Sequence, residues 1–371
     1  MRKILVPRCR IALSPIAQRP VFADVYLLVD EENTPLWHEN LFLIDIAQCY
    51  GINTCKAYAT DLLSFTRMYQ FLGGWQAVKQ STLTGYLAGD LIQSREYSES
   101  SMARHITTLK SFYSWLHRKG YLTSEQKLIW EYRKYYVNST NDKKAVEAAQ
   151  HSHHSSYIDE KNYKKLLLHV HGNSPFNTAR DKICLRLGYE TGTRAQEVLG
   201  IQLKTAIDLI LQSKYKNNGI WATTAYPLIG KGNKRRDIFL TPSLCEDIHA
   251  LITRFTRTFE QPSTNLLCRE DGQSLLNQKH ASYVFTKAQL ESGLPRLGHQ
   301  GYHALRKSFG TNLVNECHKN GLDPWVIVPR RMGHKRRETT FGYIFFEALL
   351  NGRSTLLSDL RMMRFEGIRN D

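Results

Sequence analysis

The sequence lacks any apolar run that approaches the roughly 20 residues of a membrane-spanning helix. Near its start, Arg8 and Arg10 interrupt the apolar residues before the core of a signal peptide could form. The pattern therefore argues against a membrane-spanning or secreted protein. We expect a cytoplasmic protein that has no membrane partner.

Paired cysteines and clustered metal ligands are also missing. The seven cysteines are odd in number and scattered, and no two of them form a Cys-x-x-Cys pair, so we expect free thiols in a reducing compartment. The histidine-rich stretch 151–154 has no neighbouring cysteine and no carboxylate at helical spacing, which favours a polar linker over a metal site. The sequence shows no acidic cluster of the kind that holds two metal ions, and we predict no metal and no cofactor.

Positive charge, by contrast, is abundant. The formal net charge is +16 and the pI is near 9.5. This excess favours a polyanionic partner, with nucleic acid first and an anionic membrane surface second. At 371 residues with 42% apolar content, the chain is long for one core, so we expect two domains.

The N-terminal third combines helical patterns with sharp glycine breaks. Residues 1–36, with a strand-like run at 21–29, are expected to form a small appendage of unreadable role. Four short helices within 37–122 would form a compact all-α unit, and its residues Phe112, Tyr113 and Trp115 fit a core better than base stacking. The solvent face of this unit would carry basic residues that either stay solvated or contact DNA, namely Arg104, His105, Lys110, Arg118 and Lys119.

A polar linker is expected over 123–158, and a second domain over 159–371. Within this domain, residues 190–200 are typical of a helix, a tight turn and another helix. Gly192 permits the turn, and Thr193 with Gln196 fits a capping box. This arrangement would place Arg194 in the first turn of the second helix, with its guanidinium pointing outward.

A hairpin is expected over residues 218–240. Strand-like runs at 220–225 and 236–240 flank a glycine-rich, basic turn. The tip of such a hairpin could reach a phosphate or a groove through its basic residues, Lys231, Lys234 and Arg235.

Residues 301–343 concentrate side chains that suit phosphate chemistry. His303 and Arg306 are three residues apart, so they share one face of a helix, and His334 and Tyr343 follow. Such residues are poor core filler, but they could hold a phosphate and attack it with a phenol. Basic residues between the last two are expected to contact DNA, namely Lys335 and Arg336. The amphipathic tail beyond them could cap its own domain or dock on a neighbouring protomer.

The order of these features resembles the tyrosine recombinase, or phage integrase, family. The family's Thr-Gly-x-Arg-x-x-Glu pattern appears at 191–197, its basic hairpin at 230–234, its His-x-Leu-Arg block at 303–306 and its Leu-Gly-His block, with methionine for leucine, at 332–334. The resemblance assigns catalytic roles to Arg194, Lys231, His303, Arg306, His334 and Tyr343. Lys234 stays an alternative for the lysine, because the stretch before the hairpin is longer than in short members.

The resemblance also implies a fold and a chemistry. The fold is mostly α with two domains: an all-α core-binding (SAM-like) domain, and an α+β catalytic domain with a small antiparallel sheet, the DNA breaking-rejoining enzyme fold. The two arginines would hold the non-bridging oxygens of a phosphorane, and the histidines would donate or move protons. Tyr343, whose ordinary pKa is about 10, would form a 3′-phosphotyrosyl intermediate while Lys231 protonates the leaving 5′-oxygen, without ATP or metal.

The partners that the resemblance implies are double-stranded DNA and a homotetramer acting on two DNA sites, with the tail helix joining protomers. The N-terminal segment and the long loops favour the integrase of a mobile element, while a chromosome-dimer resolvase and a transposon recombinase remain alternatives. Whether an accessory directionality or DNA-bending protein takes part stays open. From other classes, the alternatives are a type IB topoisomerase-like enzyme and a non-catalytic DNA-binding regulator.

Overall fold

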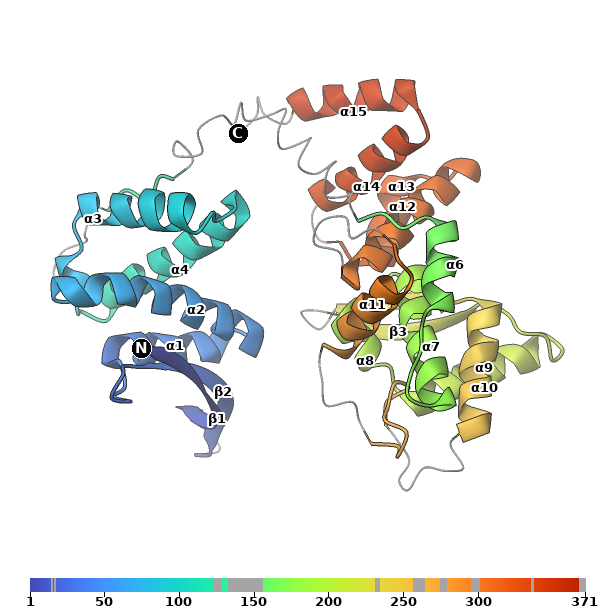
Figure 1. The fold of residues 1–371 in the computed structure, drawn as a ribbon, viewed down its shortest axis with the longest axis horizontal. Coiled ribbons are helices and arrows are strands. Elements are labelled where there is room, and N and C mark those ends of the chain that lie inside the picture. The colour runs from blue at the N-terminus through green and yellow to red at the C-terminus, as the bar shows by residue number, and fades with distance from the viewer. Residues whose placement is uncertain are drawn as a thin grey trace. The chain divides into compact units, whose positions relative to one another are not determined.

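In the computed structural model the chain forms two compact units, Met1–Ser139 and Thr140–Asp371, and each has a hydrophobic core of its own. Both units are mostly helical, as expected from the sequence. Within the described residues each unit contains a two-stranded antiparallel sheet (Figure 1), although the sequence predicted a sheet only in the second domain. No helix in the described part of the chain is long and apolar enough to cross a membrane. The structure describes residues 1–14, 16, 18–122, 128–132, 156–230, 234–255, 264–273, 279–294, 301–334 and 337–366. Most of the predicted linker, with its histidine cluster, lies outside these residues.

The N-terminal unit consists of a β-hairpin followed by helices. The hairpin pairs β1 (Arg2–Leu13) with β2 (Pro20–Val29). The helical segments are α1 (Trp37–Cys49), α2 (Ile52–Tyr69), α3 (Gln80–Thr84), the π-helical η3 (Gly85–Ser94) and α4 (Glu99–Arg118). The four expected helices are therefore present, and the third is divided between α3 and η3. The side chain of Ser98 accepts a hydrogen bond from the backbone N–H of Ser101, which caps α4.

The hairpin is part of the N-terminal unit rather than a separate appendage. Val25 and Leu28 of β2 are fully buried in the core of this unit. Asn40 of α1 also exchanges two hydrogen bonds with the backbone of Leu28, of 2.7 and 2.8 Å. The strand β2 was expected, whereas β1 was not, because Pro7 and two bulges interrupt the alternation of its side chains.

The core of the N-terminal unit contains the aromatic residues of α4, as predicted, but it also contains His105. The aromatic residues Phe112, Tyr113 and Trp115 are buried. His105 is fully buried, so its assignment to a DNA-contacting surface was wrong. The physical reason is a non-local partner, since its ring nitrogens lie 3.2 Å from Asp61 Oδ1 and 3.0 Å from the Tyr86 hydroxyl.

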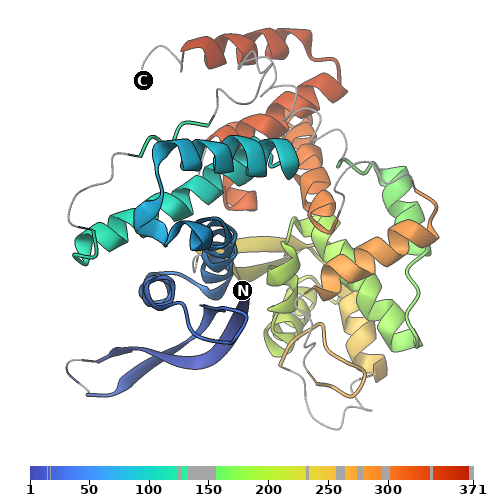
Figure 2. The ribbon, with the colours of Figure 1, turned by 60° about the vertical axis from the view of Figure 1, so that its left-hand side comes forward.

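The C-terminal unit is built around α7, which contacts α8, α10, α11, α12 and β4. Figure 2 shows α12 and α11 crossing beside α7. The elements of this unit are α6 (Glu160–Leu168), α7 (Pro175–Thr191), α8 (Ala195–Leu199), α9 (Leu203–Lys216), β3 (Thr224–Gly230), β4 (Lys234–Leu240), α10 (Pro242–Phe255), α11 (His280–Glu291), α12 (His303–Lys319), α13 (Pro324–Met332), α14 (Arg337–Leu350) and α15 (Ser354–Glu366).

The predicted basic hairpin is present as β3 and β4, which pair from Thr224 opposite Leu240 to Gly230 opposite Lys234. The first strand begins four residues later than expected, because the alternating burial that fixes it starts at Thr224. The tip, residues 231–233 with Lys231, lies outside the described residues. The structure therefore describes the stem of this hairpin.

The predicted tail consists of the end of α14, a turn and α15. The carboxylate of Glu347, fully buried on α14, accepts hydrogen bonds from Arg353 in the turn and lies 2.9 Å from His318 of α12. Leu360 of α15 is buried in a cluster with Tyr343 and Val314. The described apolar residues of α15 thus pack on their own unit, which favours the first of the two expectations for the tail.

Candidate active site

Five of the six residues assigned by resemblance lie on the described elements of the C-terminal unit. Arg194 precedes α8, His303 and Arg306 lie in the first turn of α12, His334 follows α13, and Tyr343 lies on α14. Lys231 is outside the described residues, and so is the side chain of the alternative, Lys234. The arrangement at the site can therefore be built from the five described residues.

Arg306 holds the site together, because its guanidinium bonds to two turns that are distant in sequence. Its Nη1 donates to the carbonyl of Gly192, and its Nη2 donates to the carbonyl of Met332. The first turn leads to Arg194 and the second leads to His334. The Arg306 side chain is 1% exposed, and a guanidinium has five N–H donors, so two bonds can fix it while others reach a ligand.

Arg194 is positioned by the carboxylate of Glu197, the last residue of the Thr-Gly-x-Arg-x-x-Glu pattern. Glu197 accepts the backbone N–H of Arg194 at 2.8 Å and its Nη1 at 2.6 Å. Arg194 is consequently the residue before α8 rather than in its first turn, and its guanidinium does not simply point outward. The expected capping box of Thr193 with Gln196 was wrong, because Glu197 closes the turn and the buried Thr193 hydroxyl lies near Tyr302.

A second arginine, Arg236 of β4, completes this arrangement. Its Nη1 and Nη2 donate to the two carboxylate oxygens of Glu197, both at 2.8 Å, and its side chain is only 6% exposed. These two guanidinium groups hold the pKa of Glu197 low, at about 2, against the raising effect of burial. Arg236 was missed at the level of the sequence, although its place two residues after Lys234 put both on the same face of the strand.

The surroundings of the two histidines favour the neutral form of their rings. Burial, followed by the positive charge of Arg306, lowers the pKa of His303 to about 4, even though part of this residue remains open to solvent. Burial and the same guanidinium lower the pKa of His334 to about 4. The Nδ1 of His334 lies 3.0 Å from the Thr340 hydroxyl, which orients the ring. Neutral imidazoles can donate one hydrogen bond and accept a proton at the other nitrogen.

Tyr343 lies directly against this cationic cluster. Its ring stacks on His334, with 5.4 Å between the ring centroids and 21° between the planes, and the residue is 4% exposed. Burial raises the pKa of the Tyr343 phenol, while Arg306 and Arg194 oppose that rise. The site can therefore hold an anion through guanidinium groups and offer it a phenol.

A glycine provides the space for this ring. A Cβ atom on Gly310 of α12 would lie 2.5 Å from Cε1 and 2.7 Å from Cδ1 of Tyr343. Real Cβ atoms do not approach other atoms so closely. Gly310 was not predicted to matter, because a glycine within a helix carries no signal of what packs on it.

The remaining predicted DNA-contacting residues are only partly described. Arg104 of α4 keeps 45% of its side chain exposed while it donates to Asp61 Oδ2 at 2.6 Å. Lys110 of α4 and Arg235 of β4 are exposed. Lys335 and Arg336 lie outside the described residues.

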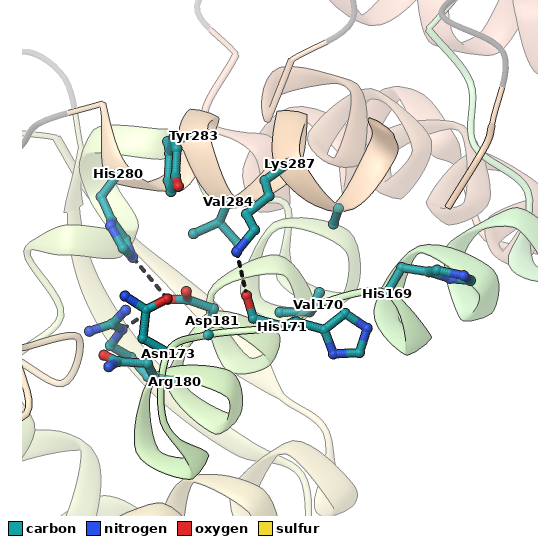
Figure 3. A pocket seen from close by; sticks show the side chains of 13 residues that line it. His169, Val170, His171, Asn173, Arg180, Asp181, His280, Tyr283, Val284 and Lys287 are labelled. Carbon is teal, nitrogen blue, oxygen red and sulfur yellow. Dashed lines mark hydrogen bonds and ion pairs between the residues drawn. The ribbon is translucent and has the colours of Figure 1, made fainter. Parts of the chain in front are cut away.

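A separate polar pocket of about 180 Å³ lies at the other end of α7 (Figure 3). Asp181 sits at its centre and bonds to Arg180 Nε at 2.8 Å and His280 Nε2 at 2.9 Å. Asp181 precedes the end of α7 at Thr191 by ten residues, or roughly 15 Å of helix, so this pocket is distinct from the site at Arg194. Asp181 is paired with both Arg180 and His280, as in a structural ion-pair network.

Comparisons with known proteins agree with this geometry. Residues 156–346 match the phage integrase family, and residues 41–120 match the phage integrase N-terminal SAM-like domain. Tyrosine recombinase XerC of Listeria welshimeri is 27% identical over 296 residues, covering 78% of this chain and 86% of that protein. Tyrosine recombinase XerC of Halalkalibacterium halodurans is 24% identical over 316 residues, covering 82% and 90%.

Solved structures show the same fold at low sequence identity. The XerH site-specific recombinase in a post-cleavage complex with its palindromic difH substrate superposes with a TM-score of 0.61 at 18% identity, covering 87% of this chain and 85% of that chain. Lambda integrase residues 75–356 bound to DNA superpose with a TM-score of 0.56 at 12% identity, covering 84% and 95%. The family match spans more than half of the chain and contains all five described site residues. This chain therefore belongs to the phage integrase family of tyrosine recombinases.

Proposed function

We propose that this protein is a site-specific DNA recombinase that cleaves and rejoins duplex DNA with Tyr343 as its nucleophile. The observation that carries the proposal is the position of the Tyr343 ring, which stacks on His334 beside Arg306. Two guanidinium groups, two neutral imidazoles and a phenol in one site match the needs of phosphoryl transfer, where charge builds up on the non-bridging oxygens.

In the proposed reaction, Arg194 and Arg306 bind the non-bridging oxygens of the scissile phosphate. The Tyr343 oxygen attacks phosphorus, the bond from phosphorus to the 5′-oxygen breaks, and a 3′-phosphotyrosyl bond forms. The phenol proton passes to a neutral acceptor, for which the imidazoles of His303 and His334 are suited. The leaving 5′-oxygen takes a proton, and the resemblance assigns that step to Lys231. Reversal with another 5′-hydroxyl rejoins the strand without an external energy source.

We infer further that four protomers act on two DNA sites and that the protein is the integrase of a mobile element. The support for the subtype is the segment before residue 41, which precedes the matched family domains. A reaction with the two ends of a candidate element and a reaction with two copies of a chromosomal site distinguish the subtypes, because sequencing of the joints identifies which pair recombines. The mass of a complex with a synthetic Holliday junction tests the number of protomers.

A nicked suicide DNA that carries a candidate attachment site tests the chemistry. With EDTA present, wild type should give a covalent protein–DNA adduct on a denaturing gel, and Tyr343→Phe should give none. Tyr226→Phe is the matched control, since Tyr226 is equally buried at 4% exposure but lies on β3. Relaxation of supercoiled DNA without site preference would instead support a topoisomerase-like enzyme. Unchanged function of Tyr343→Phe would support a regulator.

A further inference from the structure

The N-terminal β-hairpin lies outside both segments that match the family, and its composition is unusual. Its strands carry one carboxylate, Asp24, which accepts the backbone N–H of Arg8 at 3.0 Å. The hairpin's outer end extends away from α1 and α2 (Figure 2), and Ile16 there is 95% exposed. The basic residues of the two strands and their connection are Arg2, Lys3, Arg8, Arg10 and Arg19.

Two lysines are held together where the hairpin meets α2. The Nζ atoms of Lys3 and Lys56 lie 6.0 and 5.8 Å from the centroid of the same ring, that of Tyr26. Burial and then the charge of Lys56 lower the pKa of Lys3. Among the described residues no carboxylate lies within ion-pair distance of either lysine, and Asp61, which opposes the effect, is already bonded by Arg104. An anionic ligand would relieve the repulsion between these two lysines.

This lysine pair continues into a basic surface along one face of α2. Lys56, Thr60 and Ser64 are spaced four residues apart, so they share this face. Lys3 of β1 donates to the Thr60 hydroxyl, and Arg95 donates to Ser64 Oγ at 2.7 Å. Without the hairpin, the line of basic residues on the helices would end at Lys56. The hairpin extends this line through Lys3.

The outer part of the hairpin presents arginine beside exposed aromatic surface. The Arg8 guanidinium lies 5.6 Å from the ring centroid of Phe22, which is itself half exposed. Arg10 and Arg19 are exposed on the same stretch of the hairpin. These arginines have few carboxylates near them. Such a surface favours a partner that carries phosphates over a protein partner, because protein surfaces mix charges of both signs.

We propose that the hairpin and the Lys56 face of α2 form an additional arm that binds the sugar–phosphate backbone of duplex DNA. The proposal depends on the proposed function only in naming DNA as the ligand. The contact is electrostatic and independent of sequence, because the surface offers side-chain cations rather than a group shaped to read base edges. Lys56 belongs to the SAM-like segment, residues 41–120, and the hairpin would extend the contacts of that segment along the DNA.

The test is equilibrium binding of the full chain to a random-sequence duplex over a series of salt concentrations. The arm variant replaces Arg8, Arg10 and Arg19 of the hairpin by glutamine, and a charge-matched control replaces Lys161, Lys164 and Lys165 of α6, all exposed in the other unit. Each lost phosphate contact should reduce the magnitude of the slope of log K against log salt by about 0.9. The slope of the arm variant should therefore be smaller in magnitude than that of wild type by about 2 to 3. Thermal unfolding of both variants confirms that they are folded.

Each outcome bears on the arm separately from the chemistry. An arm variant with the slope of wild type, or with a loss no larger than that of the control, would overturn the proposal. Loss of self-association at an unchanged slope would do the same, and would identify the hairpin as a contact between copies of the chain. Because the probe needs no target site and no cleavage, a reduced slope would support the arm even if no Tyr343 adduct forms on any DNA.

Discussion

At the scale of single residues, Arg236 is the group that links the basic hairpin to the proposed phosphate site. It donates to both oxygens of Glu197, which in turn holds the backbone and the guanidinium of Arg194. A carboxylate that is gripped from two sides cannot rotate, so the direction of Arg194 is set by a residue of β4. Arg236 is therefore a positioning residue in the proposed reaction.

Replacing Arg236 by lysine tests this role. Lysine keeps the charge but cannot make the paired bonds to Glu197, so Arg194 should shift by a fraction of an ångström or more. We expect the single-turnover rate of adduct formation to fall by roughly 100-fold, the effect typical of a small misplacement, with duplex affinity unchanged. Arg269→Lys, at an exposed ion pair with Asp271, is the control. Equal rates for the two variants would contradict the positioning role.

The acid sensitivity of the fold should follow from His303 and His334. Their pKa values fall to about 4 in the folded protein, from an ordinary value of 6.5. The unfolded chain therefore binds more protons between these values, so stability is full above pH 6.5 and decreases as the pH falls toward 4. Thermal unfolding of His303→Gln/His334→Gln should show a smaller decrease over this range than wild type. An identical decrease would assign the acid sensitivity to other groups.

The role of a residue could be predicted from the sequence where it belongs to a local motif. It could not be predicted where the residue acts through a partner that is distant in the sequence. The blocks around Arg194, Arg306 and Tyr343 are short and follow one another in a fixed order, so the sequence motifs alone were enough to predict them as candidate site residues. His105 could not be placed, because its partner Asp61 is 44 residues away and only the packing of α2 on α4 brings the two together. Arg236 was missed for the same reason, since Glu197 lies 39 residues before it.

At the scale of elements, the approach of α14 to α12 sets the position of Tyr343. The ring lies over Gly310, where the absence of a side chain lets the helices come close. Gly310→Ala should displace the ring from His334 and abolish or severely slow adduct formation, at a cost to stability of about 1 to 3 kcal/mol from overpacking. Gly89→Ala, within a helical segment where a Cβ meets nothing within 4 Å, is the control. Wild-type adduct formation by Gly310→Ala would show that the ring does not need this space.

Element boundaries are easiest to predict from the sequence where a capping side chain or a glycine marks them. Ser98 begins α4 through its side-chain cap, and Gly192 ends α7 in a left-handed conformation with φ of 69°. The strand β1 and the return of α15 onto its own unit carry no such signal. Both depend on burial against residues far along the chain, as Leu360 does beside Val314.

At the scale of the whole molecule, two units with separate cores are joined by a polar segment, and each carries basic residues. The N-terminal unit presents Lys56 and Arg104, and the C-terminal unit holds Arg194 and Arg306. If both grip one duplex, the second contact is intramolecular once the first has formed. The affinity of the joined chain then exceeds that of either unit, by about 100- to 10,000-fold for a linker that spans the two sites.

Cutting the linker after purification tests whether both units act on one duplex. A protease site inserted between residues 140 and 150 leaves both cores intact, because each is complete within its own unit. We expect the cut protein to need a far higher concentration for half-maximal adduct formation, within that 100- to 10,000-fold range, and to reach the wild-type rate at saturation. The uncut insertion variant controls for the added residues. An unchanged half-maximal concentration would mean that the C-terminal unit finds and cleaves DNA by itself, and the positive charge of the N-terminal unit would then need another explanation.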